Sequence, residues 1–458
     1  MAERFEIVEK ALLKMLEEKK YAALRDILLV MNPSDIAALF VGLEEGRIPL
    51  LFRLLPKEMA AETFVEMEPE AQELLIRSFS DNELKEIVDE LYVDDAADLV
   101  EEMPANVVKR ILQQADPEMR RSINQILRYP EYSAGSLMTT EYVSLRPDMT
   151  VGEAILRIRR QGVDKETIYT CYVTRDRHLL GLVTVKDLLL ADDDETKIED
   201  IMVTNLISVT THTDQEEVAR MFSKYNFLAL PVVDKENRMV GIVTFDDAMD
   251  VIEEEVTEDM ELMGGMLPSE KTYLRSSAFE LFKNRIPWLM LLMVSATFTG
   301  LIITAFEGAL AAQVALTAFI PMLMGTGGNS GSQSSVTVIR ALSLDELDFR
   351  DIGRVIWKEL RTALLCGVAL AVVCFVKIWL VDKLLMGNDS ITLLIDAVVC
   401  LALLVTVVFA KVVGGTLPLI AKALKLDPAV MASPFITTIV DALSLLVYFL
   451  FAQLLLGV

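Results

Sequence analysis

The chain has 458 residues, of which 53% are hydrophobic and 24% charged, and its mean hydropathy is +0.40. Residues 1–270 carry 29 Lys+Arg against 56 Asp+Glu, whereas residues 271–458 carry 14 against 12. This distribution excludes an ordinary soluble protein and predicts an acidic front joined to a nearly neutral, apolar back. The acidic front argues against nucleic acid as a partner and favours cations as ligands, although acidic helices also serve solubility alone.

Residues 1–134 are predicted to form an acidic, all-α helical superhelix domain. Pro or Asp marks a helix start every 10–13 residues, in LPKE (55–58), MEPE (67–70), FSDN (79–82), YVDD (92–95), EMPA (102–105) and ADPE (115–118). This period suits short helices that stack around their own core. In DDAAD, Asp94 and Asp98 lie one turn apart on one face, which by itself usually serves capping and solvation. The charged start MAERFEIVEK predicts no cleavable signal peptide.

Residues 135–252 contain an internal repeat. Segments 137–189 and 201–249 each predict a helix, two β-branched strands and a second helix, and each closes with Gly-x-Val-Thr-x-x-Asp. The double copy resembles an α/β pair of cystathionine-β-synthase (CBS) domains. In such pairs the closing Thr and Asp, here Thr184 and Asp187, often meet an adenine nucleotide, so the resemblance makes ATP a candidate cofactor. The candidate contacts are Tyr169, Thr184, Lys186 and Asp187.

The second copy runs into an acidic helix, and residues 253–282 are predicted as a connecting helix and linker. Its acidic residues occupy successive turns with no nearby base before Lys271, and they are Asp246, Asp247, Asp250, Glu254, Glu255, Glu258 and Asp259. Because like charges at i,i+3 and i,i+4 repel, this run predicts half of a hard-cation site. Carboxylates without His or Cys suit Mg²⁺ or Ca²⁺ rather than zinc or copper.

Residues 283–458 are predicted to form a five-helix α transmembrane domain. The apolar segments are 286–306, 309–340, 362–381, 391–415 and 430–456, each near the ~20 residues that a spanning helix needs. Basic residues cluster before the first span, between the second and third, and after the fourth. The loops around Glu307 and at 386–390 are short and poor in Lys and Arg, so the front is expected in the cytosol and the C-terminus outside.

Cysteine usage agrees with a cytosolic front. The residues Cys171, Cys366, Cys374 and Cys400 form no CxxC pair, so reduced, buried thiols are expected.

Polar residues interrupt three of the spans. The run GTGGNSGSQSS (325–335) predicts tight helix packing, a broken helix lining a wet cavity, or a mixture of both. We expect Asp396 and Lys411, in the fourth span, to reach the membrane–water interface, and Lys377, in the third, to do so by snorkelling.

Asp441 differs because it lies about 11 residues into the fifth span, too deep for its short side chain to reach headgroups. A charge at mid-membrane costs roughly 2.5–3.5 kcal/mol on insertion scales. A position lining an aqueous cation path explains such a residue. The alternative is a carboxylate buried against Lys411 or a backbone donor.

The order of these parts, together with GTGGNSGSQSS and SPFITTIVDALSLL (433–446), closely resembles the MgtE family of magnesium channels over essentially the whole chain. The resemblance implies a homodimer in the bilayer of the plasma membrane (the cell inner membrane), with a pore between the two transmembrane domains. It also implies that Asp441 of each subunit faces the pore axis, and that the connecting helix plugs the pore when cytosolic Mg²⁺ is high.

The resemblance further implies a set of regulatory carboxylates that bind Mg²⁺. They are Glu62, Asp94 and Asp98 in the helical domain, Asp214, Glu216, Asp247 and Asp250 in the CBS pair, and Glu255, Glu258 and Asp259 in the connecting helix. Asn226 stands where family members can carry an acid, which implies that one regulatory site is weaker or absent.

We therefore expect a Mg²⁺-selective, Mg²⁺-gated channel or transporter for passive uptake, closed by its own ion as negative feedback. The sequence has no Walker-type GxxxxGK and no nucleophile–base pairing, so neither an ATP-driven pump nor an enzyme is expected. The alternatives are a transporter of Ca²⁺, Mn²⁺ or Co²⁺, and a membrane sensor of nucleotides or cations that transports nothing.

Overall fold

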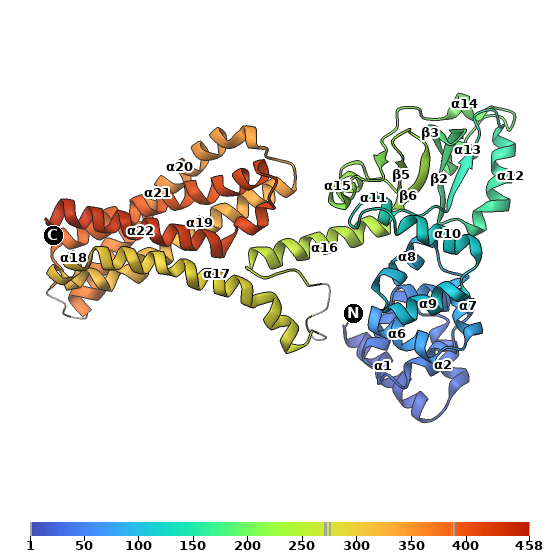
Figure 1. The fold of residues 1–458 in the computed structure, drawn as a ribbon, viewed down its shortest axis with the longest axis horizontal. Helices are drawn as coiled ribbons and strands as arrows, with labels where there is room; N and C mark the ends of the chain where they lie inside the picture. Colours follow the sequence, from blue (N-terminus) through green and yellow to red (C-terminus); the bar gives the residue numbers. More distant parts are fainter. Residues whose placement is uncertain (1, 270–272, 274–275, 386, 388–389, 458) are drawn as a thin grey trace. The chain divides into compact units, whose positions relative to one another are not determined.

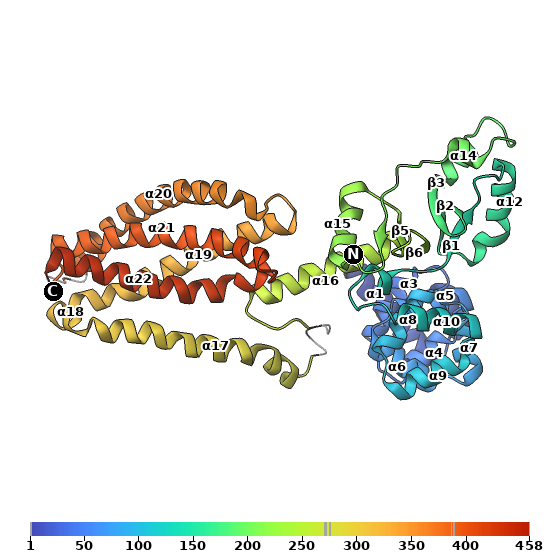
Figure 2. The ribbon, with the colours of Figure 1, turned by 45° about the horizontal axis from the view of Figure 1, so that its top comes forward.

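The computed structural model describes residues 2–269, 273, 276–385, 387 and 390–457. They form two compact units, Met1–Glu253 and Glu254–Val458, which run from blue to green and from yellow to red in Figures 1 and 2. Parts of the predicted linker, including Lys271, and of the predicted outer loop 386–390 lie outside the described residues.

The first unit begins with a series of short helices, which confirms the predicted helical domain. They are α1 (Ala2–Glu17), α2 (Tyr21–Leu28), α3 (Pro33–Val41), α4 (Ile48–Phe52), α5 (Lys57–Val65), α6 (Pro69–Ser78), α7 (Asp81–Val88), α8 (Val93–Glu102), α9 (Ala105–Gln114) and α10 (Pro117–Ile126). Ser80 and Glu83 form a capping box at α7, and Asp116 accepts from two backbone N–H groups at α10. Buried apolar side chains from each helix share one core.

The two CBS copies follow in the same unit. The first contains α11 (Ala134–Leu137), β1 (Tyr142–Leu145), α12 (Val151–Gln161), the 3₁₀ helix η1 (Gly162–Asp164), β2 (Thr167–Arg175), β3 (His178–Thr184), α13 (Val185–Leu189) and α14 (Ile198–Ile201). The second contains β4 (Val209–Thr210), α15 (Gln215–Tyr225), β5 (Ala229–Val233), β6 (Met239–Thr244) and the start of α16 (Phe245–Met263).

Each copy forms a three-stranded sheet, in the orders β1-β2-β3 and β4-β5-β6. The predicted pair of strands is the antiparallel pair β2–β3 or β5–β6. Each sheet also has a short parallel edge strand, β1 or β4, which the sequence pattern did not predict.

The second unit contains the long apolar helices. They are α17 (Ala278–Ala305), α19 (Ile320–Ser343), α20 (Ile352–Lys377), α21 (Leu393–Ala423) and α22 (Ser433–Leu456). Shorter segments connect them, namely α18 (Glu307–Ala312), η2 (Val314–Phe319), η3 (Phe349–Asp351), the π-helical η4 (Ile378–Leu385) and η5 (Pro428–Met431). Four helical stretches in the described chain are long and apolar enough to cross a membrane, and α19 is not among them because of its polar run.

The predicted second span, 309–340, is not one helix. The chain forms α18 and η2 first, and α19 begins only at Ile320. The break therefore precedes the polar run 325–335, which itself lies within continuous helix. In Figures 1 and 2, α19 lies beside α21 and α22, in agreement with their extensive contacts.

Small residues explain why the polar face of α19 can pack so closely. A Cβ added at Gly327 would lie 2.7 Å from Ser444 Oγ, and one at Gly328 would lie 2.9 Å from Thr437 Cγ2. A Cβ at Gly331 would lie 2.8 Å from Ile436 Cγ2. The glycines of the polar run thus serve close helix packing against α22.

Candidate cation site

Carboxylates from the helical domain and the CBS pair lie close together in the first unit. Asp94 of α8 is only 6% exposed, and like-charge repulsion links it to Asp247 of α16. Asp98, one turn along α8, interacts with the same Asp247. The two domains are also joined directly, because the backbone N–H of Val93 donates to Glu141 Oε2 at 3.1 Å. Three of the predicted regulatory carboxylates are therefore brought together.

The electrostatics of this cluster favour protonated carboxyls. The pKa rises to about 7 for Asp95, about 8 for Asp98 and about 6 for Asp247, and the pKa of Asp94 is raised as well. Glu166 has a pKa of about 8. Burial is the largest cause in each case, and repulsion from Asp247 comes next for the three aspartates of α8.

Two carboxylate oxygens of the cluster have the chemistry of ligands for a hard cation. Asp94 Oδ1 and Glu166 Oε2 are buried without a hydrogen-bond partner in the described part of the chain. Carboxylate oxygens are the ligands that Mg²⁺ prefers. Across the described residues, no three His, Cys, Asp or Glu side chains converge tightly enough to hold a metal ion directly.

The prediction missed Asp95, Glu141 and Glu166 as members of the cluster. Glu141 and Glu166 lie directly before β1 and β2, whose parallel register pairs Tyr142 with Thr167. The backbone N–H of Glu166 donates to the carbonyl of Glu141 at 3.0 Å, so the two residues are neighbours. Only the strand pairing brings these acids together, and recognising β1 would have revealed them.

Asp250 and Glu62 belong to a neighbouring part of the same unit. The pKa of Asp250 is raised, first by burial and then by repulsion from Glu66. Glu66 follows Glu62 by one turn at the end of α5, so Glu62 lies near the same face.

The predicted residues at α15 have local partners instead. Asp214 caps the helix, with its Oδ1 accepting from the N–H of Glu216 at 3.0 Å. Glu216 forms an ion pair with Arg220 at 3.3 Å. Asn226 ends α15 with φ of 54°, a left-handed position that Asn tolerates better than most residues.

The predicted nucleotide contacts surround a pocket in the CBS pair. Its lining residues are Tyr169, Thr170, Thr184, Val185, Lys186, Leu189, Leu190 and Leu228. Asp187 is not among them, because its carboxylate accepts from the Thr184 hydroxyl at 2.6 Å and from the Thr184 N–H at 3.0 Å. Thr244 and Asp247 form the same arrangement in the second copy. The Thr–Asp pair therefore caps a helix in each copy.

The later acidic residues of α16 lie near the loop before α22. The pKa of Glu258 is raised by burial, then by repulsion from Asp427 and Glu261. Asp259 Oδ2 accepts from the Ser343 hydroxyl at 3.3 Å. Leu262 shares an apolar cluster with residues of α19 and of the segment before α22. Within the second unit, the end of the connecting helix thus packs against the start of the fifth span. Glu255 lies one turn before Glu258 on the same helix and is half-buried.

Asp441 lies half-buried on α22. The nearby Thr437 and Thr438 hydroxyls both donate to the Pro434 carbonyl, and the Ser444 hydroxyl donates to the Val440 carbonyl. In the described chain no hydrogen bond or ion pair to the Asp441 carboxylate is found. Among the described residues, the Lys411 ammonium contacts Ser334 at 3.5 Å.

The expectation that charges in the third and fourth spans reach the interface is partly wrong. Asp396 is 4% exposed and Lys411 is 5% exposed, so neighbouring helices bury both. Cys400 Sγ donates to Asp396 Oδ1 at 3.5 Å. Lys377 is exposed and forms an ion pair with Asp382 at 2.8 Å. The sequence placed the charges correctly along the helices but did not reveal which face each helix buries.

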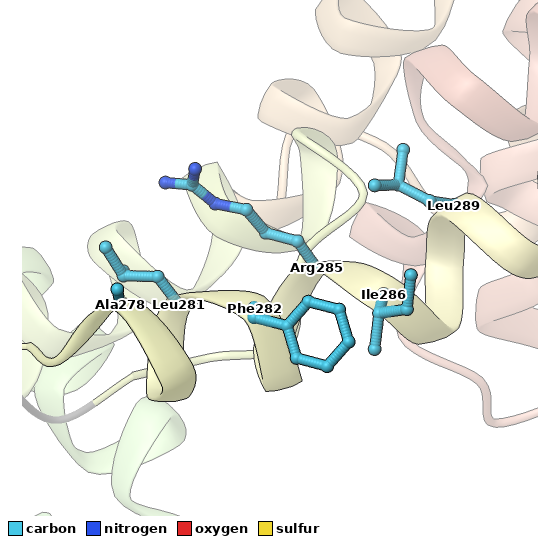
Figure 3. Close-up of a pocket in the computed structure, with 6 residues that line it drawn as sticks. All are labelled: Ala278, Leu281, Phe282, Arg285, Ile286 and Leu289. Carbon is cyan, nitrogen blue, oxygen red and sulfur yellow. The ribbon is translucent and has the colours of Figure 1, made fainter.

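An open hollow along the first turns of α17 is lined mostly by apolar side chains, unlike the carboxylate cluster. It is lined by Ala278, Leu281, Phe282, Arg285, Ile286 and Leu289, all from this helix. In Figure 3, Arg285 extends away from the Phe282 ring, so polar groups do not converge there. None of the apolar window of α17 is buried inside the chain. This surface suits contact with lipid or another subunit rather than a cation.

Comparison with known proteins covers the whole chain. Residues 31–132 match the MgtE intracellular N domain, residues 134–194 and 198–254 match the CBS domain, and residues 320–451 match MgtE, described as a divalent cation transporter. The chain is 39% identical over 451 residues to "Magnesium transporter MgtE" of Thermus thermophilus, covering 97% of this chain and 98% of that protein. It is 34% identical over 436 residues to the protein of the same name from Bacillus subtilis, covering 95% and 94%.

Solved structures resemble the first unit. The cytosolic domain of the Mg²⁺ channel MgtE in complex with ATP is 40% identical, with a TM-score of 0.51, and covers 53% of this chain and 99% of that chain. The soluble part of a magnesium transporter is 31% identical, also with a TM-score of 0.51, covering 55% and 99%.

These matches agree with the predicted order of helical domain, CBS pair and membrane spans. They identify a membrane protein with an intracellular N domain, and a transporter rather than an enzyme. Because full-length relatives and the domain matches agree, this chain belongs to the MgtE family of magnesium transporters.

Proposed function

We propose that the protein is a Mg²⁺-selective channel for passive uptake across the plasma membrane, closed by cytosolic Mg²⁺. The observation that carries this proposal is the cluster of Asp94, Asp98 and Asp247, where two cytosolic domains place buried carboxylates against one another. Such a cluster disfavours the compact arrangement unless protons or cations bind to it.

Binding of Mg²⁺ to this cluster supplies the closing signal. An ion that binds the compact arrangement more tightly than the open one shifts the population toward it, by no more than that difference in affinity. The contact of the end of α16 with α19 and with the segment before α22, through Leu262, supports transmission of this change to the membrane helices. The transported ion therefore closes its own path.

Asp441 lines the conduction path in this proposal. Mg²⁺ dehydrates reluctantly, so the carboxylates of two subunits hold a hydrated ion through its waters. The membrane potential supplies about 2.3 kcal/mol per charge per 100 mV, and twice that for a divalent ion. The unburied surface of α17 supports a homodimer, which cross-linking in membranes would test. The basic residues of the predicted inner loops support a C-terminus on the outside in this proposal.

Flux measurements on Asp441→Asn test the conduction path. In liposomes with an enclosed Mg²⁺ dye, this variant should lose at least about 90% of Mg²⁺ uptake, because the only deep carboxylate of the fifth span is neutralised. Glu307→Gln, an exposed acid at the start of α18, serves as the control and should conduct normally. Uptake that persists in Asp441→Asn contradicts the pore assignment. Competition by Ca²⁺, Mn²⁺ and Co²⁺ in the same assay measures selectivity.

Nucleotide binding is proposed for the CBS pocket lined by Tyr169, Thr184 and Lys186. The homologous cytosolic domain crystallised with ATP supports this assignment. Lys186→Met should weaken ATP binding about tenfold in calorimetry, because a phosphate-facing cation is lost. Lys235→Met, at an exposed loop lysine, is the control. If titration of ATP into the unaltered protein produces no heat of binding, ATP is excluded as a cofactor.

A further inference from the structure

A charged pair is joined by a serine hydroxyl inside the membrane unit. The Ser334 hydroxyl of α19 donates to Glu359 Oε2 of α20 at 2.6 Å. The Lys411 ammonium of α21 donates to the same Ser334 oxygen at 3.5 Å. One hydroxyl can donate once and accept as well, so Ser334 bridges the acid and the base. Three membrane helices therefore meet at one polar contact.

The burial of this bridge makes its charges costly to leave alone. Lys411 is 5% exposed and Ser334 is 3% exposed, whereas Glu359 is half-buried. A buried ion pair gains little over apolar packing, but removal of one partner leaves an uncompensated charge and is strongly unfavourable. Ionisable residues within membrane helices are accordingly rare and call for a functional explanation.

Two glycines of α21 make room for the bridge. A Cβ at Gly415 would lie 2.9 Å from Glu359 Cγ, and a Cβ at Gly414 would overlap the carbonyl of Gly331. The sequence GGT at 414–416 thus allows α20 and α19 to approach α21 closely. Both the glycines and the charges serve the same helix junction.

The junction adjoins the α22 segment that carries Asp441. Gly331, one turn before Ser334 on α19, packs against Ile436 and Val440 of α22, and Asp441 follows Val440 directly. The bridge therefore lies one turn along α19 from a contact with the α22 segment that carries Asp441.

We propose that Lys411 and Glu359, joined through Ser334, are positioning residues for Mg²⁺ conduction. They hold α19 against α20 and α21, and each of the two charges compensates the other, so that neither acts unbalanced on an ion in the conduction path. This inference rests on the proposed role of Asp441 in conduction.

The charge balance predicts opposite effects for the two single substitutions. Glu359→Gln leaves the positive charge of Lys411 uncompensated at this helix junction, which repels a divalent ion in the path. Lys411→Met leaves an uncompensated negative charge, which attracts it. The double variant is neutral again, so its Mg²⁺ dependence should return toward that of the unaltered protein.

The test is Mg²⁺ uptake into liposomes as a function of external Mg²⁺, using the full chain. Glu359→Gln should raise the half-saturating Mg²⁺ concentration by about threefold or more, and Lys411→Met should lower it by about two- to threefold. Lys411→Arg retains the charge and should leave the concentration unchanged within about twofold. The double variant should recover both the concentration and the maximal flux.

A purely structural bridge gives a different pattern. Both single variants would then lower the maximal flux without opposite shifts in the half-saturating concentration, and this result overturns the proposal. If neither single variant assembles, the double variant decides, since its failure to conduct also overturns the proposal. Asp441→Asn is measured in the same assay. Normal flux in that variant refutes the conduction path itself. If Asp441→Asn loses its flux but Glu359→Gln and Lys411→Met do not shift the half-saturating Mg²⁺ concentration in opposite directions, only the charge-balanced bridge is refuted.

Discussion

The backbones of Gly414 on α21 and Gly331 on α19 approach so closely that a Cβ at Gly414 would overlap the Gly331 carbonyl. The run 325–335 suggested either helix packing or a wet cavity, because small residues serve both. The structure places Gly327, Gly328 and Gly331 against α22. Whether the run packs tightly or lines a cavity depends on which helix lies against it, and the sequence alone does not specify that helix.

The contact predicts a large effect of a single methyl group. Gly414→Ala should lower the apparent melting temperature in detergent by several degrees, because the new Cβ meets the Gly331 carbonyl and overpacking of this kind costs about 1–3 kcal/mol. Gly300→Ala on α17 is the control, since a Cβ there meets nothing within 4 Å. It should be neutral or slightly stabilising, as Ala favours helices. Equal melting temperatures for the two variants would contradict the packing argument.

Helices of the first unit were predictable, whereas two of its strands were not. Pro and Asp at the helix starts are local signals, and the structure places α5 to α10 directly after them. Strands β1 and β4 have only four and two residues, and each is defined by pairing with a distant strand. The missed acids Glu141 and Glu166 lie at the start of such a pair, so the missed strand concealed part of the cation site.

The capping box of α7 allows a test of whether the residues at a helix start stabilise that helix. Ser80→Ala should destabilise the isolated first unit by about 1 kcal/mol, because the N–H of Glu83 loses the Ser80 hydroxyl at 3.3 Å. Denaturant unfolding measures this free energy. Ser34→Ala, an exposed serine in the first turn of α3, is the control and should change it by less than about 0.5 kcal/mol. A similar loss in both variants would show that the cap contributes nothing specific.

Across the whole molecule, acidic charge is concentrated in the cytosolic unit, and its raised pKa values predict how stability depends on pH. Unfolded Asp and Glu have pKa values near 4, whereas Asp95, Asp98 and Glu166 have values of about 7 to 8 when folded. Between about pH 4 and pH 8 the folded unit therefore binds more protons than the unfolded chain. By linkage, its stability falls as the pH rises through this window.

Calorimetry of the first unit without divalent ions should show this dependence. Its melting temperature is expected to be about 5 °C lower at pH 8 than at pH 6. The combined variant Asp95→Asn and Asp98→Asn should flatten the profile, because two of the shifted groups no longer titrate. Asp26→Asn, at an exposed residue of α2, should leave the profile unchanged. A profile that rises toward pH 8 would contradict the electrostatics of the cluster.

Mg²⁺ should counteract the loss of stability at high pH, because in the proposed function the carboxylate cluster is the cytosolic Mg²⁺ sensor. At pH 8 a larger fraction of these carboxylates is ionised and available, so millimolar Mg²⁺ should raise the melting temperature of the first unit by several degrees in a saturable way. At pH 6 protons compete for the same groups, and the rise should be much smaller. Na⁺ at equal ionic strength separates binding from screening, since an equal rise with Na⁺ would reduce the effect to screening alone. In the combined variant Asp95→Asn and Asp98→Asn, Mg²⁺ should raise the melting temperature much less. In liposomes, the same variant should remain open at Mg²⁺ concentrations that close the unaltered protein.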